Sequence, residues 1–149
     1  MGLKSYKPYT KSTRTTVLVD RKNIWKGSPY KPLTRGKHSS GGRNNLGRIT
    51  SRARGAGHKK RYRIIDFHRN KIDMTGTVDR IEYDPNRSSY IALITYEDKT
   101  KTYIICPQNI KIGDKIISGT NKEIKVGNCM PLGDIPPCLL YTSDAADDP

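Results

Sequence analysis

Positive charge is concentrated in the first 63 of the 149 residues, and this asymmetry limits what the chain can fold into more than any other feature. Residues 1–63 hold nine Lys, nine Arg and one acidic residue, Asp20, which gives a net charge of +17. Residues 64–137 hold ten basic and ten acidic residues and are neutral. A segment with so much like charge and few apolar side chains cannot form a core alone. We therefore expect an extended basic arm over residues 1–60, followed by a folded unit.

The basic segment Gly47–Arg63 has the composition of a phosphate-binding segment. Guanidinium groups bind phosphate oxygens with two parallel hydrogen bonds, and glycines such as Gly55 and Gly57 let the backbone approach a phosphate closely. The segment lacks interleaved aromatic residues, which favours contacts to the backbone and shape of a nucleic acid over reading of its bases. A solvated tail that adds only solubility is the simplest alternative. Trp25 and Tyr30 argue against it, since they could pack on a partner, stack on a base or form a local apolar contact.

From residue 61 onward the pattern becomes that of β-structure. Runs of β-branched and aromatic residues between turn signals predict strands at residues 62–67, 76–83, 90–96, 101–106, 115–118 and 123–126, besides a short one at 16–19. The sequence Asp-Pro-Asn-Arg at 84–87 is a strong turn signal. Val78 and Ile81 are three residues apart, and a β-bulge between them would place both on one face.

Short strands joined by tight turns, without a long helix, predict a mainly β protein. We expect an OB-like small antiparallel β-barrel over residues 61–110 and, over residues 111–137, the first strands of an incomplete SH3-like barrel, a name that rests on the family resemblance given below.

Motifs for catalysis, nucleotide binding and metal binding are missing. Gly42 and Gly47 have the spacing of a phosphate loop, but Arg48 and Ile49 follow where Lys and Ser or Thr are required. The three cysteines, at 106, 129 and 138, have no C-x-x-C spacing. No apolar run could span a membrane, and the first residues do not resemble a secretory signal. We expect a soluble protein that is not an enzyme, with no cofactor, metal, membrane or small-molecule substrate.

Two other function classes share some of these features. A free OB-type binder of single-stranded RNA or DNA would expose aromatic side chains on its barrel for base stacking, and four tyrosines could serve, namely Tyr83, Tyr90, Tyr96 and Tyr103. The neutral charge of the barrel region argues against this class. An RNA-modifying enzyme would need a catalytic domain for which the chain has no room.

Five long motifs carry a family resemblance: SGGRNNLGRIT, RGAGHKKRYRIIDFHRNK, IEYDPNRSSYIALITY, YIICPQNIKIGD and IKVGNCMPLGDIPP. From Met1 to Pro137 the chain resembles the universal large-subunit ribosomal protein L-two family, in its bacterial or organellar form. The resemblance implies a structural constituent of the large ribosomal subunit that binds large-subunit rRNA, contacts neighbouring ribosomal proteins, and supports the peptidyl-transferase region and subunit association. It also implies a ribosome in the bacterial cytoplasm, or in an organellar matrix if the gene is organelle-encoded.

In this family, RNA contacts concentrate in the matched Gly-Arg-Asn-Asn and Arg-Gly-x-Gly-His-Lys segments and at three basic positions further on. For each of these three residues, at 69, 71 and 87, the alternative to RNA binding is a structural role within the protein. Together with the other basic residues of the arm, the candidate RNA-binding residues are Lys37, Arg43, Asn44, Asn45, Arg48, Arg52, Arg54, Gly55, Gly57, His58, Lys59, Lys60, Arg61, Arg63, Arg69, Lys71 and Arg87.

The chain departs from the family pattern in two places. Ala56 stands where the family usually has a third glycine, which would strain a backbone that requires positive φ. The last twelve residues, 138–149, match nothing in the family and resemble the translation of a sequencing adapter. We expect them to be an artificial end to a gene fragment.

Overall fold

The computed structural model describes residues 2–37, 39–55 and 57–136, and within these ranges the protein is mainly β, as predicted. The predicted strain at Ala56 and the predicted artificial end at residues 138–149 concern residues outside these ranges. The elements in chain order are β1 (Leu3–Ser5), α1 (Lys11–Thr15), β2 (Val17–Val19), η1 (Lys31–Leu33), β3 (Thr34–Gly36), β4 (Arg61–Arg63), β5 (Gly76–Glu82), β6 (Ile91–Tyr96), β7 (Lys101–Ile105), β8 (Lys115–Ile116) and η2 (Leu132–Asp134).

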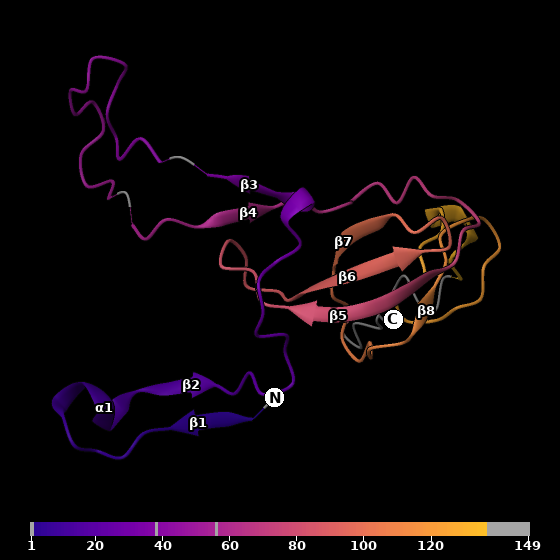
Figure 1. Ribbon diagram of the computed structural model, residues 1–149, viewed down its shortest axis with the longest axis horizontal. Coiled ribbons are helices and arrows are strands. Elements are labelled where there is room, and N and C mark those ends of the chain that lie inside the picture. The colour runs from indigo at the N-terminus through magenta and orange to yellow at the C-terminus, as the bar shows by residue number, and fades with distance from the viewer. Residues whose placement is uncertain (1, 38, 56, 137–149) are drawn as a thin grey trace, which may run out of the picture.

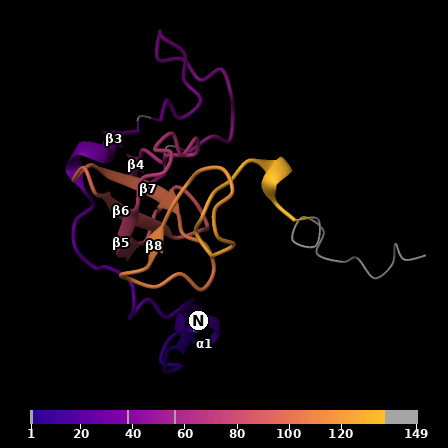
Figure 2. The ribbon, with the colours of Figure 1, turned by 90° about the vertical axis from the view of Figure 1, so that its right-hand side faces the viewer.

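The central feature is a four-stranded antiparallel sheet with the order β7-β6-β5-β8. It is curled into an open half-barrel, consistent with the predicted OB-like fold (Figures 1 and 2). Strand β8 lies in the range expected to begin a second β unit, and it pairs with β5 of this sheet. The turn predicted at 84–87 connects β5 to β6, and residues 97–100 connect β6 to β7.

Strand β6 is buried on both of its faces, which explains its almost continuous apolar sequence. Successive side chains of a strand point to opposite faces. Ala92 and Ile94 therefore join one core cluster, with Ile104 and Ile116 among its members, whereas Ile91 joins a second. The second cluster also contains Leu93, Tyr103 and Ile65, and Tyr30 and Leu33 of the N-terminal part pack against it.

The predicted β-bulge is present in β5. The register with β6 shifts between Val78, which pairs with Ile94, and Arg80, which pairs with Leu93. As a result, Val78 and Ile81 both contact the first core cluster despite their spacing of three.

Residues 25–33 are attached to the sheet by specific hydrogen bonds. The Trp25 N–H donates to the carbonyl of Ile81 at 2.9 Å, and the Arg80 guanidinium lies 4.6 Å from the centre of the Trp25 ring. The hydroxyl of Tyr103 accepts from the Tyr30 N–H at 2.8 Å and donates to the nearly buried Glu82 carboxylate at 3.0 Å. Trp25 and Tyr30 thus make contacts within the chain.

Several elements differ from expectation. No strand forms at residues 123–126, and Ile124 and Val126 are exposed, so the prediction of a strand there was wrong. The strand expected at 62–67 ends at Arg63, and Ile65 makes only an isolated bridge to Tyr103. The strands β1 and β3 were not predicted.

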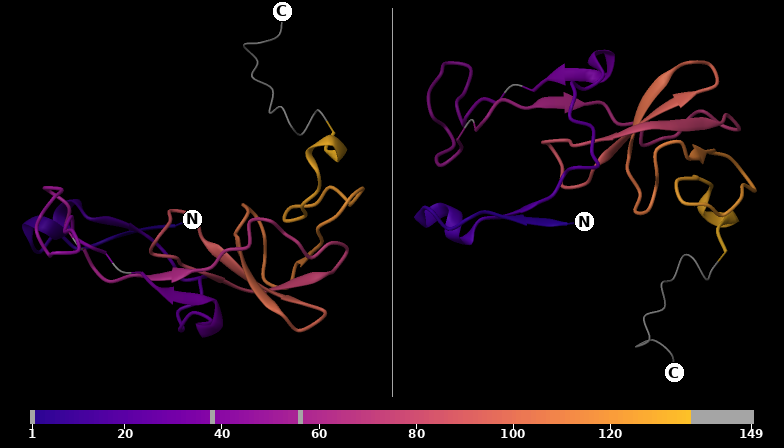
Figure 3. Two further views of the ribbon diagram at one scale, coloured as in Figure 1. Left: turned by 90° about the horizontal axis from the view of Figure 1, so that it is seen from above. Right: turned by 60° about the horizontal axis from the view of Figure 1, so that its bottom comes forward.

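Two extensions leave the same end of the sheet. One is the hairpin of β1 and β2 with α1 at its tip, and the other is the long loop between β3 and β4 (Figures 1 and 3). Both lie away from η2, which is at the opposite end (Figure 3). Within the described parts of the chain, no helix has the length and apolar character needed to cross a bilayer.

Candidate nucleic-acid interface

The loop of residues 37–60 carries most of the predicted RNA-binding residues. It projects from a two-stranded hairpin in which Thr34 pairs with Arg63 and Gly36 with Arg61. The loop contains no acidic residue. Eight of the seventeen candidates lie in it as basic or histidine side chains, namely Lys37, Arg43, Arg48, Arg52, Arg54, His58, Lys59 and Lys60, and Arg61 follows directly in β4. None of the described loop residues is buried, so this charge faces solvent.

The tip of the loop is a compact turn organised by Asn44. Its side-chain oxygen accepts the backbone N–H groups of Leu46 at 3.0 Å and Arg48 at 2.9 Å. Arg43 forms an antiparallel bridge with Ile49. Gly42 has a φ of +76°, and a side chain at this position would collide with the carbonyl oxygen of Ser51. The turn displays Arg43, Asn45 and Arg48 on its surface.

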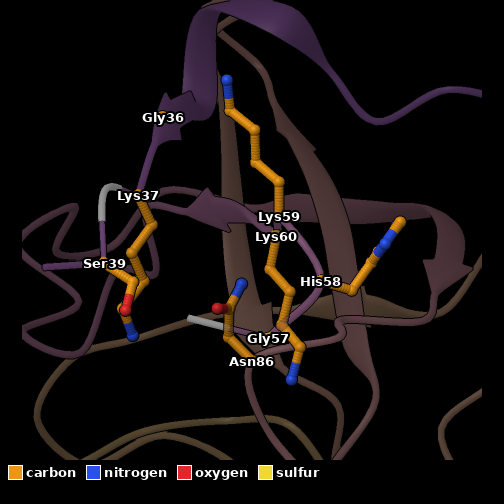
Figure 4. A pocket seen from close by; sticks show the side chains of 8 residues that line it. All are labelled: Gly36, Lys37, Ser39, Gly57, His58, Lys59, Lys60 and Asn86. Carbon is orange, nitrogen blue, oxygen red and sulfur yellow. The ribbon is translucent and has the colours of Figure 1, made fainter. Parts of the chain in front are cut away.

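A basic groove of about 700 Å³ lies at the base of the loop. Its lining consists of Gly36, Lys37, Ser39, Gly57, His58, Lys59, Lys60 and Asn86 (Figure 4). Lys59 and Lys60 extend in opposite directions, as consecutive residues of an extended backbone do (Figure 4). Gly57 has a φ of +63°, the left-handed conformation that glycine adopts readily. The groove therefore brings together candidates from both ends of the loop.

Arg63 and Arg87 belong to a different environment. Both contact the carboxylate of Asp84, which has no solvent exposure. Arg87 donates from Nε to Asp84 at 2.7 Å, and Arg63 Nη1 lies 3.9 Å from the same carboxylate. Arg63 is nine-tenths buried, whereas the Arg87 side chain keeps 18% exposure. Both arginines were predicted to contact RNA, and their shared acidic partner, Asp84, was not predicted.

Lys71 and Arg69 lie apart from the groove. The Lys71 ammonium contacts Asp98 and Thr100 and lies 4.9 Å from the centre of the Tyr96 ring. Hydrogen bonds from Lys71 and Thr100 lower the pKa of Asp98 from 3.8 to about 2. Arg69 has a φ of 53°, and its N–H donates to the Asp66 carboxylate at 2.9 Å.

Three residues, Gly36, Ser39 and Asn86, line the groove but were absent from the predicted set. Asn86 was recognised only as a turn residue, because nothing in its neighbourhood along the chain indicates a basic groove. Its carboxamide donates to the Arg61 carbonyl at 2.6 Å, across 25 positions of sequence. Such a long-range contact leaves no local signal.

Three of the four tyrosines that could serve a free single-strand binder are not free for base stacking. Tyr96 and Tyr103 are buried in the two core clusters. Tyr83 is 38% exposed, but the Arg21 guanidinium covers its ring at 3.8 Å. Across residues 2–37, 39–55 and 57–136, no group of three or more His, Cys, Asp or Glu side chains could hold a metal ion.

A curled β-sheet with an exposed, acid-free basic loop defines a nucleic-acid-binding β protein whose charge lies outside its folded core. Residues 30–118 match the family described as Ribosomal Proteins L2, RNA binding N-terminal domain. The chain belongs to this family.

Bacterial relatives are similar over most of the chain. The chain is 63% identical to "Large ribosomal subunit protein uL2" of Pelagibacter ubique (strain HTCC1062) over 137 residues, which cover 91% of this chain and 49% of that protein. The proteins of the same name from Granulibacter bethesdensis and Rickettsia canadensis are 60% and 58% identical over 136 residues, again 91% of this chain, and 49% and 50% of the relative. The chain thus spans about half the length of these relatives. All three carry the name of a ribosomal protein and none that of an enzyme.

Proposed function

We propose that this protein is a structural constituent of the large ribosomal subunit that binds large-subunit rRNA through the loop of residues 37–60. The observation that carries this is the exposed, acid-free basic loop held on a neutral folded sheet. The family description and the names of the relatives support RNA as the polyanion and the large subunit as its location.

The interaction follows from the chemistry of the loop. Each phosphate neutralised by Lys or Arg releases condensed counterions, so a loop with many exposed cations binds strongly and with a steep salt dependence. The compact tip at Asn44 and the groove at Lys59 and Lys60 display these cations at two separated places. Contacts at both places favour a folded RNA, whose phosphates are fixed in space, over an unstructured strand.

The finer parts of the proposal concern the assembled ribosome. We infer that the chain contacts neighbouring ribosomal proteins and, as part of a whole protein of the relatives' length, supports the peptidyl-transferase region and the association of the subunits. The bacterial relatives support a location on ribosomes of the bacterial cytoplasm. The seventeen candidate residues remain predicted RNA contacts, of which those exposed in the loop have the strongest structural support.

The test is binding of the 149-residue chain to large-subunit rRNA and to an unrelated duplex DNA over a series of salt concentrations. We expect steep salt slopes for both ligands and binding to the rRNA that persists at salt concentrations where duplex DNA is released. Equal, purely salt-driven loss of both ligands would contradict recognition of rRNA and leave only a generic cationic loop.

A further inference from the structure

Asp84 is the one acidic side chain of the described residues with no solvent exposure. It lies in the turn that follows β5, beside the base of the basic hairpin. A buried carboxylate is costly unless charged or hydrogen-bonding groups surround it, and removing one of these partners is strongly destabilising. We therefore expect the side chains that pair with Asp84 to be fixed in position together with its carboxylate.

These partners come from two parts of the chain. Within its own turn, Asp84 accepts the Asn86 N–H at 2.9 Å, the Asn86 carboxamide at 3.1 Å and Arg87 Nε at 2.7 Å. From β4, the Arg63 guanidinium lies 3.9 Å away. The Asn86 carboxamide also donates to the carbonyl oxygen of Arg61 in β4 at 2.6 Å. The carboxylate is thus joined to β4 through both Arg63 and Asn86.

Strand β4 leads directly out of the basic groove. Lys59 and Lys60 line the groove immediately before β4 begins at Arg61, and Asn86 lines it from the sheet side. Among the residues that the structure describes, β4 pairs with one strand, the three-residue β3. A hairpin this short is marginal without further contacts. The bridge from Ile65 to Tyr103 and the packing of Leu33 attach its base to the sheet, and the Asp84 contacts add the attachment of β4 nearest the groove.

We propose that Asp84, acting through Asn86 and Arg63, is a positioning residue of the RNA interface that holds Lys59 and Lys60 at a fixed place relative to the sheet. The proposal rests on the proposed function, since it concerns recognition of folded rRNA. It also gives Arg63 a role inside the protein. Arg87 donates to Asp84 through Nε, and its guanidinium carbon lies 5.8 Å from the centre of the Tyr62 ring in β4.

Positioning and charge have separable effects on binding. Counterion release depends on how many cations meet phosphates, and loosening the hairpin leaves that number unchanged. Recognition of a folded RNA requires that several cations meet phosphates at fixed places simultaneously, and a loose hairpin must be ordered on binding. Loss of the Asp84 contacts should therefore reduce selectivity for rRNA over duplex DNA without changing the salt slope.

The experiment compares Asn86→Ala and Asp84→Asn with the wild-type chain and with Asp79→Asn. Asp79 is the control, because it is an aspartate of β5, the strand that leads to Asp84, and it also pairs with a basic residue, Lys101, whereas its hydrogen bonds and ion pair go to β6 and β7 and none goes to β4. For both test variants we expect the ratio of rRNA to duplex DNA affinity to fall about tenfold, the effect of losing one charge-assisted or buried hydrogen bond. The salt slopes of both variants and the ratio for Asp79→Asn should stay at the wild-type values.

Circular dichroism establishes that each variant keeps its sheet. If Asp84→Asn unfolds, Asn86→Ala decides, because it removes the hydrogen bond from the Asn86 carboxamide to β4 and leaves Asp84 paired with Arg63 and Arg87. A wild-type ratio in folded Asn86→Ala would overturn the proposal. If the wild-type chain itself has no preference for rRNA over duplex DNA, the proposed function is contradicted. The wild-type chain therefore tests the proposed function, and the Asn86→Ala chain tests the positioning role of Asp84.

Discussion

Lys59 and Lys71 carry the same charge in different surroundings. Lys59 lines the open groove, whereas Lys71 already contacts Asp98 and Thr100 and covers the Tyr96 ring. A phosphate that binds Lys71 must compete with Asp98, so little net charge is neutralised there. We predict that Lys59→Ala lowers the slope of log affinity against log salt by about one, and that Lys71→Ala lowers it much less.

Both variants remove one lysine, so each serves as the other's control for net charge. The measurement is rRNA binding by filter retention or fluorescence anisotropy over a salt series. An equal loss of slope in the two variants would mean that Lys71 leaves Asp98 when RNA binds.

Asp98 gives a pH-dependent prediction. Hydrogen bonds from Lys71 and Thr100 lower its pKa from 3.8 to about 2 in the folded protein. A carboxyl whose folded pKa is depressed contributes stability that is present above the unfolded pKa and is lost as pH falls through the folded one. We predict that Asp98→Asn has a lower Tm than wild type above pH 3.8, and that this difference shrinks as pH falls toward about 2.

Thermal melts monitored by circular dichroism over this pH range test the prediction. Lys71→Met removes the largest cause of the shift, so the effect of Asp98→Asn should be much smaller in that background. A difference in Tm that does not depend on pH would argue that Asp98 acts through its shape alone.

At the scale of elements, the pairing of β5 with β6 depends on a glycine at the start of β5. A Cβ added at Gly76 would lie 2.6 Å from Ile94 Cγ2 and 3.1 Å from Tyr96 Cε1. We predict that Gly76→Ala destabilises the protein by about 1–3 kcal/mol, the usual range for overpacking a core. Gly36→Ala in β3 is the matched control, since a Cβ there meets no atom within 4 Å. Urea denaturation measures both, and equal stabilities would show that the core accommodates the methyl group.

The strands of the sheet were predictable because their signals are local. In β5 to β7, β-branched and aromatic residues are bounded by turn sequences, and the spacing of Val78 and Ile81 was enough to predict the bulge. By contrast, β1 and β3 are three-residue strands without a buried side chain, so no pattern of burial marks them. The apolar pair Ile124 and Val126 has the alternation of a strand but finds no partner, and both side chains are exposed.

In the candidate site too, features with a local sequence signal were predictable and features that depend on long-range contacts were not. The cationic loop follows from composition alone, because a run of Lys and Arg without acids can be counted in the sequence. The roles of Arg63 and Asn86 could not be obtained in this way. They depend on Asp84 and Arg61, which lie 21 and 25 positions away, and on burial that only the folded chain creates.

At the scale of the whole molecule, stability and charge are separated. The sheet carries a core cluster on each face and is nearly neutral, whereas the loop of residues 37–60 has no buried residue among those described. Backbone hydrogen bonds in the loop are local, such as Thr50 N–H to the Gly42 carbonyl at 3.0 Å. Local unfolding of such a loop costs little compared with unfolding of the sheet.

Hydrogen exchange should therefore reveal two levels of protection. In the free chain, we predict slow exchange for amides of β6 and β7 and exchange near the unprotected rate for most of the loop. Binding to large-subunit rRNA should slow exchange in the loop strongly and change exchange in β6 little, because the loop is ordered against phosphates while the sheet is already folded.

Mass spectrometry of the chain with and without rRNA measures this exchange, with duplex DNA as the control for charge alone. Slow exchange at the loop tip of the free chain would mean that the cations of the tip, like Lys59 and Lys60, are prearranged before RNA binds, and the cost of ordering the tip would then no longer contribute to selectivity.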